Sequence, residues 1–269
     1  MKKPALALVA IAAYTFIAGC SSTTPPQQID TQSLYQLQCL TSDQVSSSNA
    51  AASQIRTLGL QNTALTLGAQ GGLAWRATQI NTELSRNASQ LDQIFNFNGL
   101  MLDHSVLPPV LLQGNNTLNL ADPQTIRISN VTYKIAQQAR FVTAPPTWRD
   151  YIWLNYPSPA VPNAALLPKN KQEIQIWQYY VAVGWKEGVQ QANTIYAQNL
   201  GRLKQDYNGM ILYRKLLAQK MVSPPYVATT DLGVTGNSSE LNINDQVLRI
   251  TALPSLQNNS QKWNPVVVE

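Results

Sequence analysis

Apolar residues recur at spacings of three and four along residues 56–84, as one face of a helix requires. The stripe consists of Leu65, Ala69, Leu73, Ala77, Ile80 and Leu84. The same stretch contains Gly68, Gly71 and Gly72, and each glycine costs roughly 1 kcal/mol relative to alanine inside a helix. The pattern therefore predicts either a helix that breaks at the glycines or a helix against which another backbone packs closely.

The longest periodic segment spans residues 172–224. Its apolar face consists of Ile174, Trp177, Val181, Trp185, Gly188, Ala192, Ile195, Leu203, Tyr207 and Met210. If unbroken over this segment, a helix would be more than about 60 Å long. Because Gly184, Gly188, Gly201 and Gly209 interrupt it, we expect two or three helices.

Two shorter helices have recognisable starts. Asn87 precedes Ala88, Ser89 and Gln90, which is typical of an N-cap followed by glutamine at the third helical position, and the helix would run to Phe95. Thr147, followed by Asp150, predicts a second start, because a carboxylate there is favoured by the helix dipole. This helix would carry residues 151–154 and end before Pro157.

Alternation of apolar and polar residues predicts two hairpins. The first would pair residues 126–128 with 131–135 through a turn at Ser129 and Asn130. The second would pair residues 241–243 with 247–253 through a turn at Asn244 and Asp245. The predicted fold class is α+β: a helix-dominated single domain with β-hairpins, preceded by a flexible N-terminal tether.

The N-terminus has the layout of an export signal. Lys2 and Lys3 precede an apolar run from Pro4 to Ile17, which Ala18, Gly19 and Cys20 follow. The run has 14 residues, whereas a membrane-spanning helix takes about 20. Residues 17–20 resemble a bacterial lipobox, so we expect lipidation at Cys20, with acyl chains such as palmitate. The alternative is an ordinary signal peptide with a cysteine near its cleavage site.

We therefore expect three parts: a lipoprotein signal peptide (1–19), a lipidated flexible tether (20–52) and an α+β domain (53–269). The tether is rich in Ser, Thr, Gln and Pro, a composition that cannot bury enough apolar surface to fold. Ser21 after the lipidated cysteine favours the periplasmic face of the outer membrane. Cys39 would lack a partner for an internal disulfide, and we expect a small buried residue or, less often, an intermolecular cross-link or reactive group.

The charge gives little reason to expect nucleic-acid binding. Removing residues 1–19 takes two of the 19 basic residues and leaves 17 against 14 acidic ones, a net charge of +3. The basic residues do not cluster, so we expect no direct contact with nucleic acid.

The sequence offers few candidates for catalysis. His104 is the only histidine, which excludes a multi-histidine metal site, and Asp103 beside it is badly placed to orient its ring. A murein-cleaving or murein-binding lipoprotein is the alternative function, with Glu83, Glu173 and Glu187 as candidate acids. We expect surface charges there, and we predict a non-enzymatic protein with no catalytic residues, cofactor or metal. The aromatic residues at helical spacings are expected in a core or a protein interface: Trp148, Trp153, Trp177, Trp185, Tyr179 and Tyr180.

Several long stretches are similar to the DotC family, the lipoproteins of type IVB (Dot/Icm-like) secretion systems and of IncI-type conjugation systems. The matching residues are 63–76 (TALTLGAQGGLAWR), 91–97 (LDQIFNF), 106–111 (VLPPVL), 138–153 (QARFVTAPPTWRDYIW), 209–236 (GMILYRKLLAQKMVSPPYVATTDLGVTG) and 249–253 (RITAL). They are distributed along the chain after the tether, from residue 63 to residue 253.

The resemblance implies a structural component of an outer-membrane core complex for protein transport or conjugation. It implies a DotD-like lipoprotein as partner, a DotH-like core protein that the chain helps to localise to the outer membrane, and self-association in a ring. Cys20 is the one position that the resemblance marks as functional.

Overall fold

The computed structural model describes residues 33–42 and 54–264, which divide into two compact units. Unit 1 contains the described residues up to Trp75 together with Pro157–Val189. Unit 2 contains Arg76–Tyr156 and the described residues from Gln190 onward. The predicted signal peptide and Cys20 lie outside the described residues.

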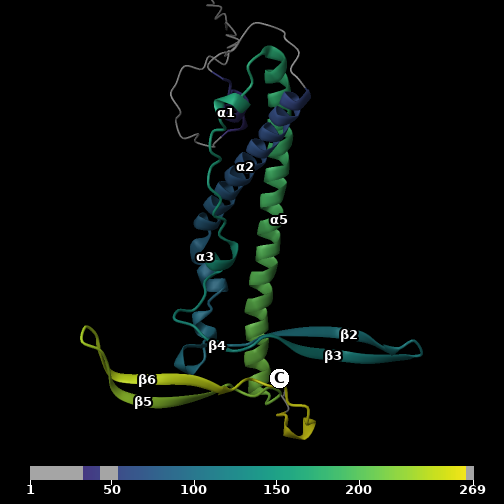
Figure 1. Ribbon diagram of the computed structural model, residues 1–269. Helices are drawn as coiled ribbons and strands as arrows, with labels where there is room; N and C mark the ends of the chain where they lie inside the picture. Colours follow the sequence, from purple (N-terminus) through teal and green to yellow (C-terminus); the bar gives the residue numbers. More distant parts are fainter. Residues whose placement is uncertain (1–32, 43–53, 265–269) are drawn as a thin grey trace, which may run out of the picture. The chain divides into compact units, whose positions relative to one another are not determined.

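Two long helices, α2 (Gln54–Arg86) and α5 (Lys171–Ala218), contribute residues to both units (Figure 1). Helix α2 confirms the helix predicted for residues 56–84. The prediction of two or three helices after residue 172 is wrong, because α5 is a single helix of 48 residues.

Glycines allow α2 and α5 to pack backbone to backbone in unit 1. A Cβ atom added at Gly68 would overlap the carbonyl oxygen of Val181, and one added at Gly184 would overlap that of Leu65. Gly188 has the same relation to Ala69. Close packing was therefore the correct alternative for the glycines of α2, and it also explains why glycines of α5 do not break that helix: the contact offsets their low helix propensity.

A short helix, α1 (Leu34–Gln38), packs on unit 1 within the segment that we expected to be a tether. Leu37 is completely buried with Leu60, Leu67 and Val181, and the indole Nε1 of Trp177 donates a 2.9 Å hydrogen bond to the Leu37 carbonyl oxygen. The tether prediction is thus wrong for residues 33–42, where the leucines supply an apolar face despite polar neighbours. The remainder of 20–52 lies outside the described residues.

Cys39 caps the C-terminus of α1 and is half-buried. It is disulfide-bonded, and the described residues include no free cysteine. The expectation that Cys39 lacks a disulfide partner is therefore wrong. The only other cysteine in the sequence is Cys20.

Unit 2 contains α3 (Ala88–Ile94) and α4 (Trp148–Ile152), both starting where predicted. At α4 the backbone N–H of Thr147 donates to Asp150 over 2.7 Å, which confirms the predicted cap. At α3, Asn87 occupies the N-cap, but its side chain donates to the Glu83 carbonyl instead of capping the helix.

Helix α4 is shorter than predicted because the Asn81 side chain binds the backbone just beyond the helix. The Asn81 amide donates to the Leu154 carbonyl and accepts from the Leu154 N–H, at 2.7 and 3.1 Å, so the backbone leaves the helix at Trp153. Trp148 and Ile152 are buried in the main core of unit 2. The other buried members of that core are Ala77, Ile80, Leu84, Phe97, Leu107, Val110, Leu154, Leu203 and Met210.

The strands of unit 2 form three two-stranded antiparallel sheets. Strand β1 (Val106–Leu107) pairs with β4 (Arg140–Phe141), β2 (Val110–Asp122) with β3 (Thr125–Gln137), and β5 (Tyr226–Gly236) with β6 (Leu241–Ala252). Single-turn 3-10 helices span Asn98–Leu100, Asp103–Ser105, Ala164–Leu166 and Ser260–Lys262.

Both hairpins exist, but both predicted turns are wrong. Residues 126–135 all lie in β3, and the first chain reversal is at Pro123 and Gln124, where the Gln124 N–H donates to the Asp122 carboxylate. Asn244 and Asp245 lie inside β6, where Asn244 has a left-handed φ of 58°. Asparagine tolerates that conformation in bulges as well as in turns, and the second reversal instead uses residues 237–240.

The α+β class, dominated by helix and containing β-hairpins, is confirmed. None of the described helices has both the length and the apolar character needed to cross a membrane.

Candidate interaction surfaces

The outer half of the β2–β3 hairpin has one apolar face. Leu118 pairs with Ile128, and Leu120 pairs with Ile126. Directly opposed residues point to the same side of a sheet, as do residues two apart in a strand, so these four side chains share a face. They are 60 to 70% exposed. We call these four residues the first apolar face.

The outer half of the β5–β6 hairpin repeats this arrangement. Val234 pairs with Ile243, and Leu241 lies opposite Gly236 on the same side. Val234, Leu241 and Ile243 are 65 to 68% exposed, and we call them the second apolar face. The residues between them on each strand, Thr235 and Asn242, are polar.

These hairpins have the properties of binding surfaces. A two-stranded sheet that is exposed on both sides is only marginally stable in water, and clustered exposed apolar side chains mark interaction sites. Each strand also pairs on one side only within the described residues, so its other edge presents backbone donors and acceptors. Both hairpins (Figure 1) are therefore suited to bind another polypeptide.

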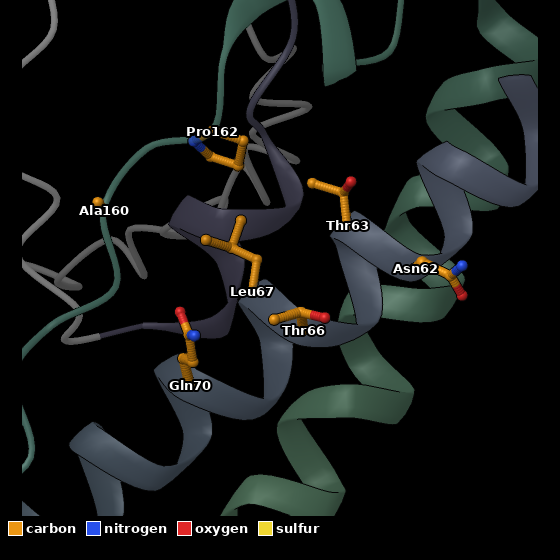
Figure 2. A pocket seen from close by; sticks show the side chains of 7 residues that line it. All are labelled: Asn62, Thr63, Thr66, Leu67, Gln70, Ala160 and Pro162. Carbon is orange, nitrogen blue, oxygen red and sulfur yellow. The ribbon is translucent and has the colours of Figure 1, made fainter.

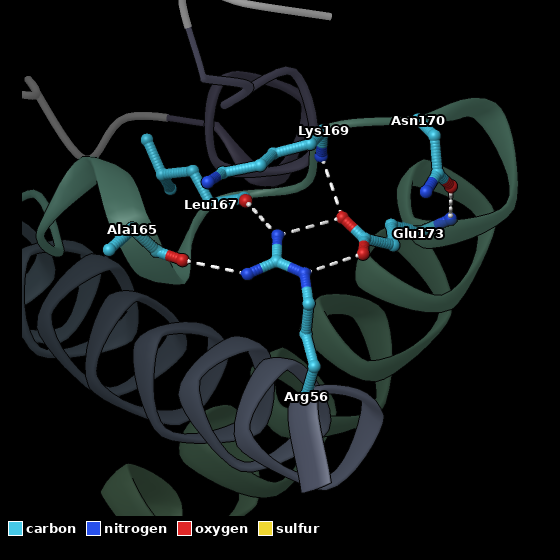
Figure 3. Close-up of polar contacts among 6 residues, drawn as sticks. All are labelled: Arg56, Ala165, Leu167, Lys169, Asn170 and Glu173. Atoms are coloured by element: carbon cyan, nitrogen blue, oxygen red, sulfur yellow. Dashed lines mark hydrogen bonds and ion pairs between the residues drawn. The ribbon is translucent and has the colours of Figure 1, made fainter. Parts of the chain in front are cut away.

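An ion pair joins the start of α2 to the start of α5 in unit 1 (Figure 3). The Arg56 guanidinium donates to both carboxylate oxygens of Glu173, at 2.7 and 2.9 Å, and also to the carbonyl oxygens of Ala165 and Leu167. The Lys169 N–H donates to the same carboxylate. One arginine thus holds the connector before α5 as well as the helix itself.

The expectation that Glu173 is a surface charge is wrong, because its side chain is only 3% exposed. The hydrogen bond from Arg56 lowers the pKa of Glu173, and the same bond raises the pKa of Arg56. Asn170 caps α5 by accepting a 2.9 Å hydrogen bond from the Glu173 N–H. Asparagine followed three residues later by glutamate is a capping pattern that could have located both residues from the sequence.

A shallow groove of about 300 Å³ lies between α2 and the connector before α5, also in unit 1. Figure 2 shows Asn62, Thr63, Thr66 and Gln70 along one side, with Ala160 and Pro162 opposite. The groove is open and the side chains that line it are neutral, so they include no charged group and no general acid or base.

The other candidates for catalysis are exposed. His104 is in an exposed turn with a left-handed φ of 59°, and Asp103 beside it is exposed too. Glu83 pairs with Arg86 on the helix surface, and Glu187 is exposed. Among the described residues, His, Cys, Asp and Glu do not gather in a group that could hold a metal ion.

The aromatic residues divide between core and surface. Trp148 and Trp177 are buried, which confirms a core role for them, and Trp185 packs on Trp75 with ring centroids 5.5 Å apart. Trp153 and Tyr179 are exposed.

Strands β2 and β5 contribute to the two apolar faces, and sequence reasoning missed both strands. The alternation of Leu118 and Leu120 with polar neighbours was a short signal for β2, but two matches are too few to predict a strand of 13 residues. In strand β5 only Leu232 and Val234 alternate, and Val227 is separated from them by threonines and Asp231, so the alternation is too short to predict the strand.

Residues 54–265 match a family of proteins described as type IV secretory system, conjugal DNA-protein transfer. The chain belongs to this family. The match includes both long helices and both hairpins, so the exposed apolar faces are part of what the family model covers. The protein therefore has a role in type IV secretion and conjugal transfer. No curated protein matches the chain.

Proposed function

We propose that this type IV secretion protein is a DotC-like structural lipoprotein of the outer-membrane core complex. Acyl chains on Cys20 hold it at the periplasmic face of the outer membrane, where it helps to localise a DotH-like protein together with a DotD-like lipoprotein. The presence of two hairpins with exposed apolar faces in unit 2 carries this proposal, because such surfaces serve assembly.

The N-terminal sequence supports the lipid anchor. A lipobox-like segment ends at Cys20 after an apolar run that is shorter than a membrane span. Each buried methylene group adds about 0.8 kcal/mol of membrane affinity, so the several chains of a lipoprotein give a stable attachment. An anchored subunit raises the effective concentration of its partners at the same membrane.

The environment of Glu173 favours a structural role over murein cleavage. A general acid in glycoside hydrolysis needs a raised pKa so that it holds a proton at neutral pH. The hydrogen bond from Arg56 lowers the pKa of Glu173 and keeps it ionised. We propose a non-enzymatic function, and a zymogram on purified peptidoglycan tests it: clearing by the isolated protein would contradict the proposal.

The lipid anchor is tested by replacing Cys20 with serine and Cys39 with serine in separate full-length variants. In membrane fractionation, Cys20→Ser should lose its outer-membrane location, and the DotH-like partner should be lost from that fraction. Cys39→Ser is the matched control because it removes the other cysteine of the chain, and it should keep both proteins in place.

Intact mass under non-reducing conditions gives the decisive readout. The sulfur atom of Cys20 cannot carry diacylglycerol in a thioether and also form a disulfide with Cys39, so these two states exclude each other and differ in mass. The proposal requires a mature protein with acyl chains at Cys20, and a mass without lipid, or an unchanged location of the Cys20→Ser variant, would refute it.

A further inference from the structure

The two hairpins of unit 2 have similar apolar faces but opposite net charges. Hairpin β2–β3 has Arg127 and Lys134 against Asp122, a net charge of +1. Hairpin β5–β6 has Arg249 against Asp231, Glu240 and Asp245, a net charge of −2. In the second hairpin, Asp231 and Glu240 lie in the outer half near the apolar face, whereas Asp245 accepts a hydrogen bond from the Thr235 hydroxyl on the opposite side.

A lipid bilayer is a poor occupant for these faces. A membrane-spanning strand presents an apolar band about 25 Å high, whereas Leu118 to Leu120 covers only about 7 Å of strand. Asp122 and Glu240 also lie at the two chain reversals, so inserting either tip would carry a carboxylate into lipid. A protein surface is the better match.

We infer that the first apolar face of one copy docks against the second apolar face of a neighbouring copy. Docking two copies of β5–β6 would bring charges of −2 together, and like charges across an interface are costly. Contact between β2–β3 and β5–β6 instead joins opposite charges and covers both apolar faces. This inference rests on the proposed structural role and adds the contact through which copies associate.

Such a contact is head-to-tail, because the two surfaces in it differ. Each copy has one of each hairpin, so each copy binds two neighbours. Head-to-tail contacts of this kind close into rings or extend as filaments.

Cysteine cross-linking in cells that contain the complete secretion apparatus tests the contact. Full-length Ile128→Cys and Ile243→Cys variants, with different tags, are expressed together and treated with a mild oxidant. A disulfide-linked dimer containing both tags is expected, whereas either variant expressed alone should give no dimer beyond that of the parent chain, which has Cys20 and Cys39 of its own.

Asn119→Cys with Asn242→Cys is the matched control. These residues lie beside the apolar faces but point to the opposite side of each hairpin, so this pair should not cross-link. Equal dimer from Ile128→Cys alone would show like-with-like docking, and a link to another protein or no link at all would show a different occupant. Each of these results overturns the inference.

Co-purification of differently tagged full-length copies gives a second measurement. The double variant Leu118→Ser, Ile128→Ser should weaken self-association by on the order of tenfold or more, with thermal unfolding unchanged because both side chains are exposed. Unweakened association would contradict the inference. If this variant instead loses binding to lipid vesicles, the faces bind membrane and the inference also fails. Lipidation and outer-membrane location should be normal in every variant, so failure of this contact is distinguishable from failure of the proposed anchor.

Discussion

At the scale of single residues, the Arg56–Glu173 pair is the interaction in the described part of unit 1 whose loss we expect to lower the free energy of unfolding most. A buried carboxylate is costly unless its oxygens are bonded, and both oxygens of Glu173 accept from Arg56. Removing the arginine would leave an unpaired charge in place rather than merely delete one contact.

We predict that Arg56→Leu lowers the free energy of unfolding by about 3 kcal/mol, as loss of one partner from a buried pair does. Urea unfolding measures this. The control is Arg86→Leu, which breaks the exposed pair with Glu83 and should cost no more than about 1 kcal/mol. Similar losses of unfolding free energy in the two variants would contradict a strongly stabilising role for the Arg56–Glu173 pair.

The same pair predicts a dependence of stability on pH. Because Arg56 lowers the folded-state pKa of Glu173 from its ordinary value of 4.5, the pair contributes fully above that value and progressively less as the pH falls through the folded-state pKa. The stability difference between the native protein and Glu173→Gln should therefore shrink below about pH 4.5. A difference that stays constant with pH would exclude this linkage.

At the scale of elements, the glycines of α5 lie in two different environments. Gly188 lies where a Cβ would overlap the Ala69 carbonyl oxygen, while Gly201 has no neighbouring atom within 4 Å. Both lie inside a helix, so both carry the same cost in helix propensity. Only Gly188 offsets this cost by allowing close packing.

Alanine substitutions at the two glycines should therefore have opposite effects. Gly201→Ala should raise the free energy of unfolding by up to about 1 kcal/mol through helix propensity. Gly188→Ala should lower it by about 1 to 3 kcal/mol, because the helices must separate. Thermal and urea unfolding compare the two, and stabilisation by both would show that the close approach is absent.

The hairpins are the elements least explained by the stability of the chain alone. Their outer halves contribute little to the cores, since the apolar side chains there face solvent. A long hairpin of that kind is understandable if its function is to be buried by a partner.

At the scale of the whole molecule, the function that we propose depends on which surfaces bind rather than on a reacting group. Substitutions on an apolar face should therefore reduce conjugal transfer, whereas substitutions at the candidate catalytic residues should not. The distinction separates a structural subunit from an enzyme in a single assay.

We predict that Leu118→Ser, Ile128→Ser reduces the frequency of plasmid transfer at least tenfold, an effect of the size expected when interface residues are lost. His104→Asn and Glu187→Gln should leave transfer unchanged. Asparagine is chosen because it tolerates the left-handed backbone of His104. Loss of transfer in either control variant would point to chemistry at that residue.

Local features were readable from the sequence. The helix over residues 56–84, the cap formed by Thr147 and Asp150, and the existence of hairpins were all predicted, because periodicity and capping depend on neighbours a few residues apart. The export signal and the lipidation at Cys20 also come from the sequence alone, and they stay predictions.

Contacts between distant residues were decided only by the tertiary structure. Helix α5 continues through Gly188 because Ala69 packs closely against it. Glu173 is buried because Arg56 neutralises its charge. Leu37 is buried beside Trp177, which donates a hydrogen bond to its carbonyl oxygen. Strand β2 forms because β3 pairs with it along its whole length. In each case the energy comes from a partner far along the chain, which no local pattern encodes, so propensity was overridden by packing.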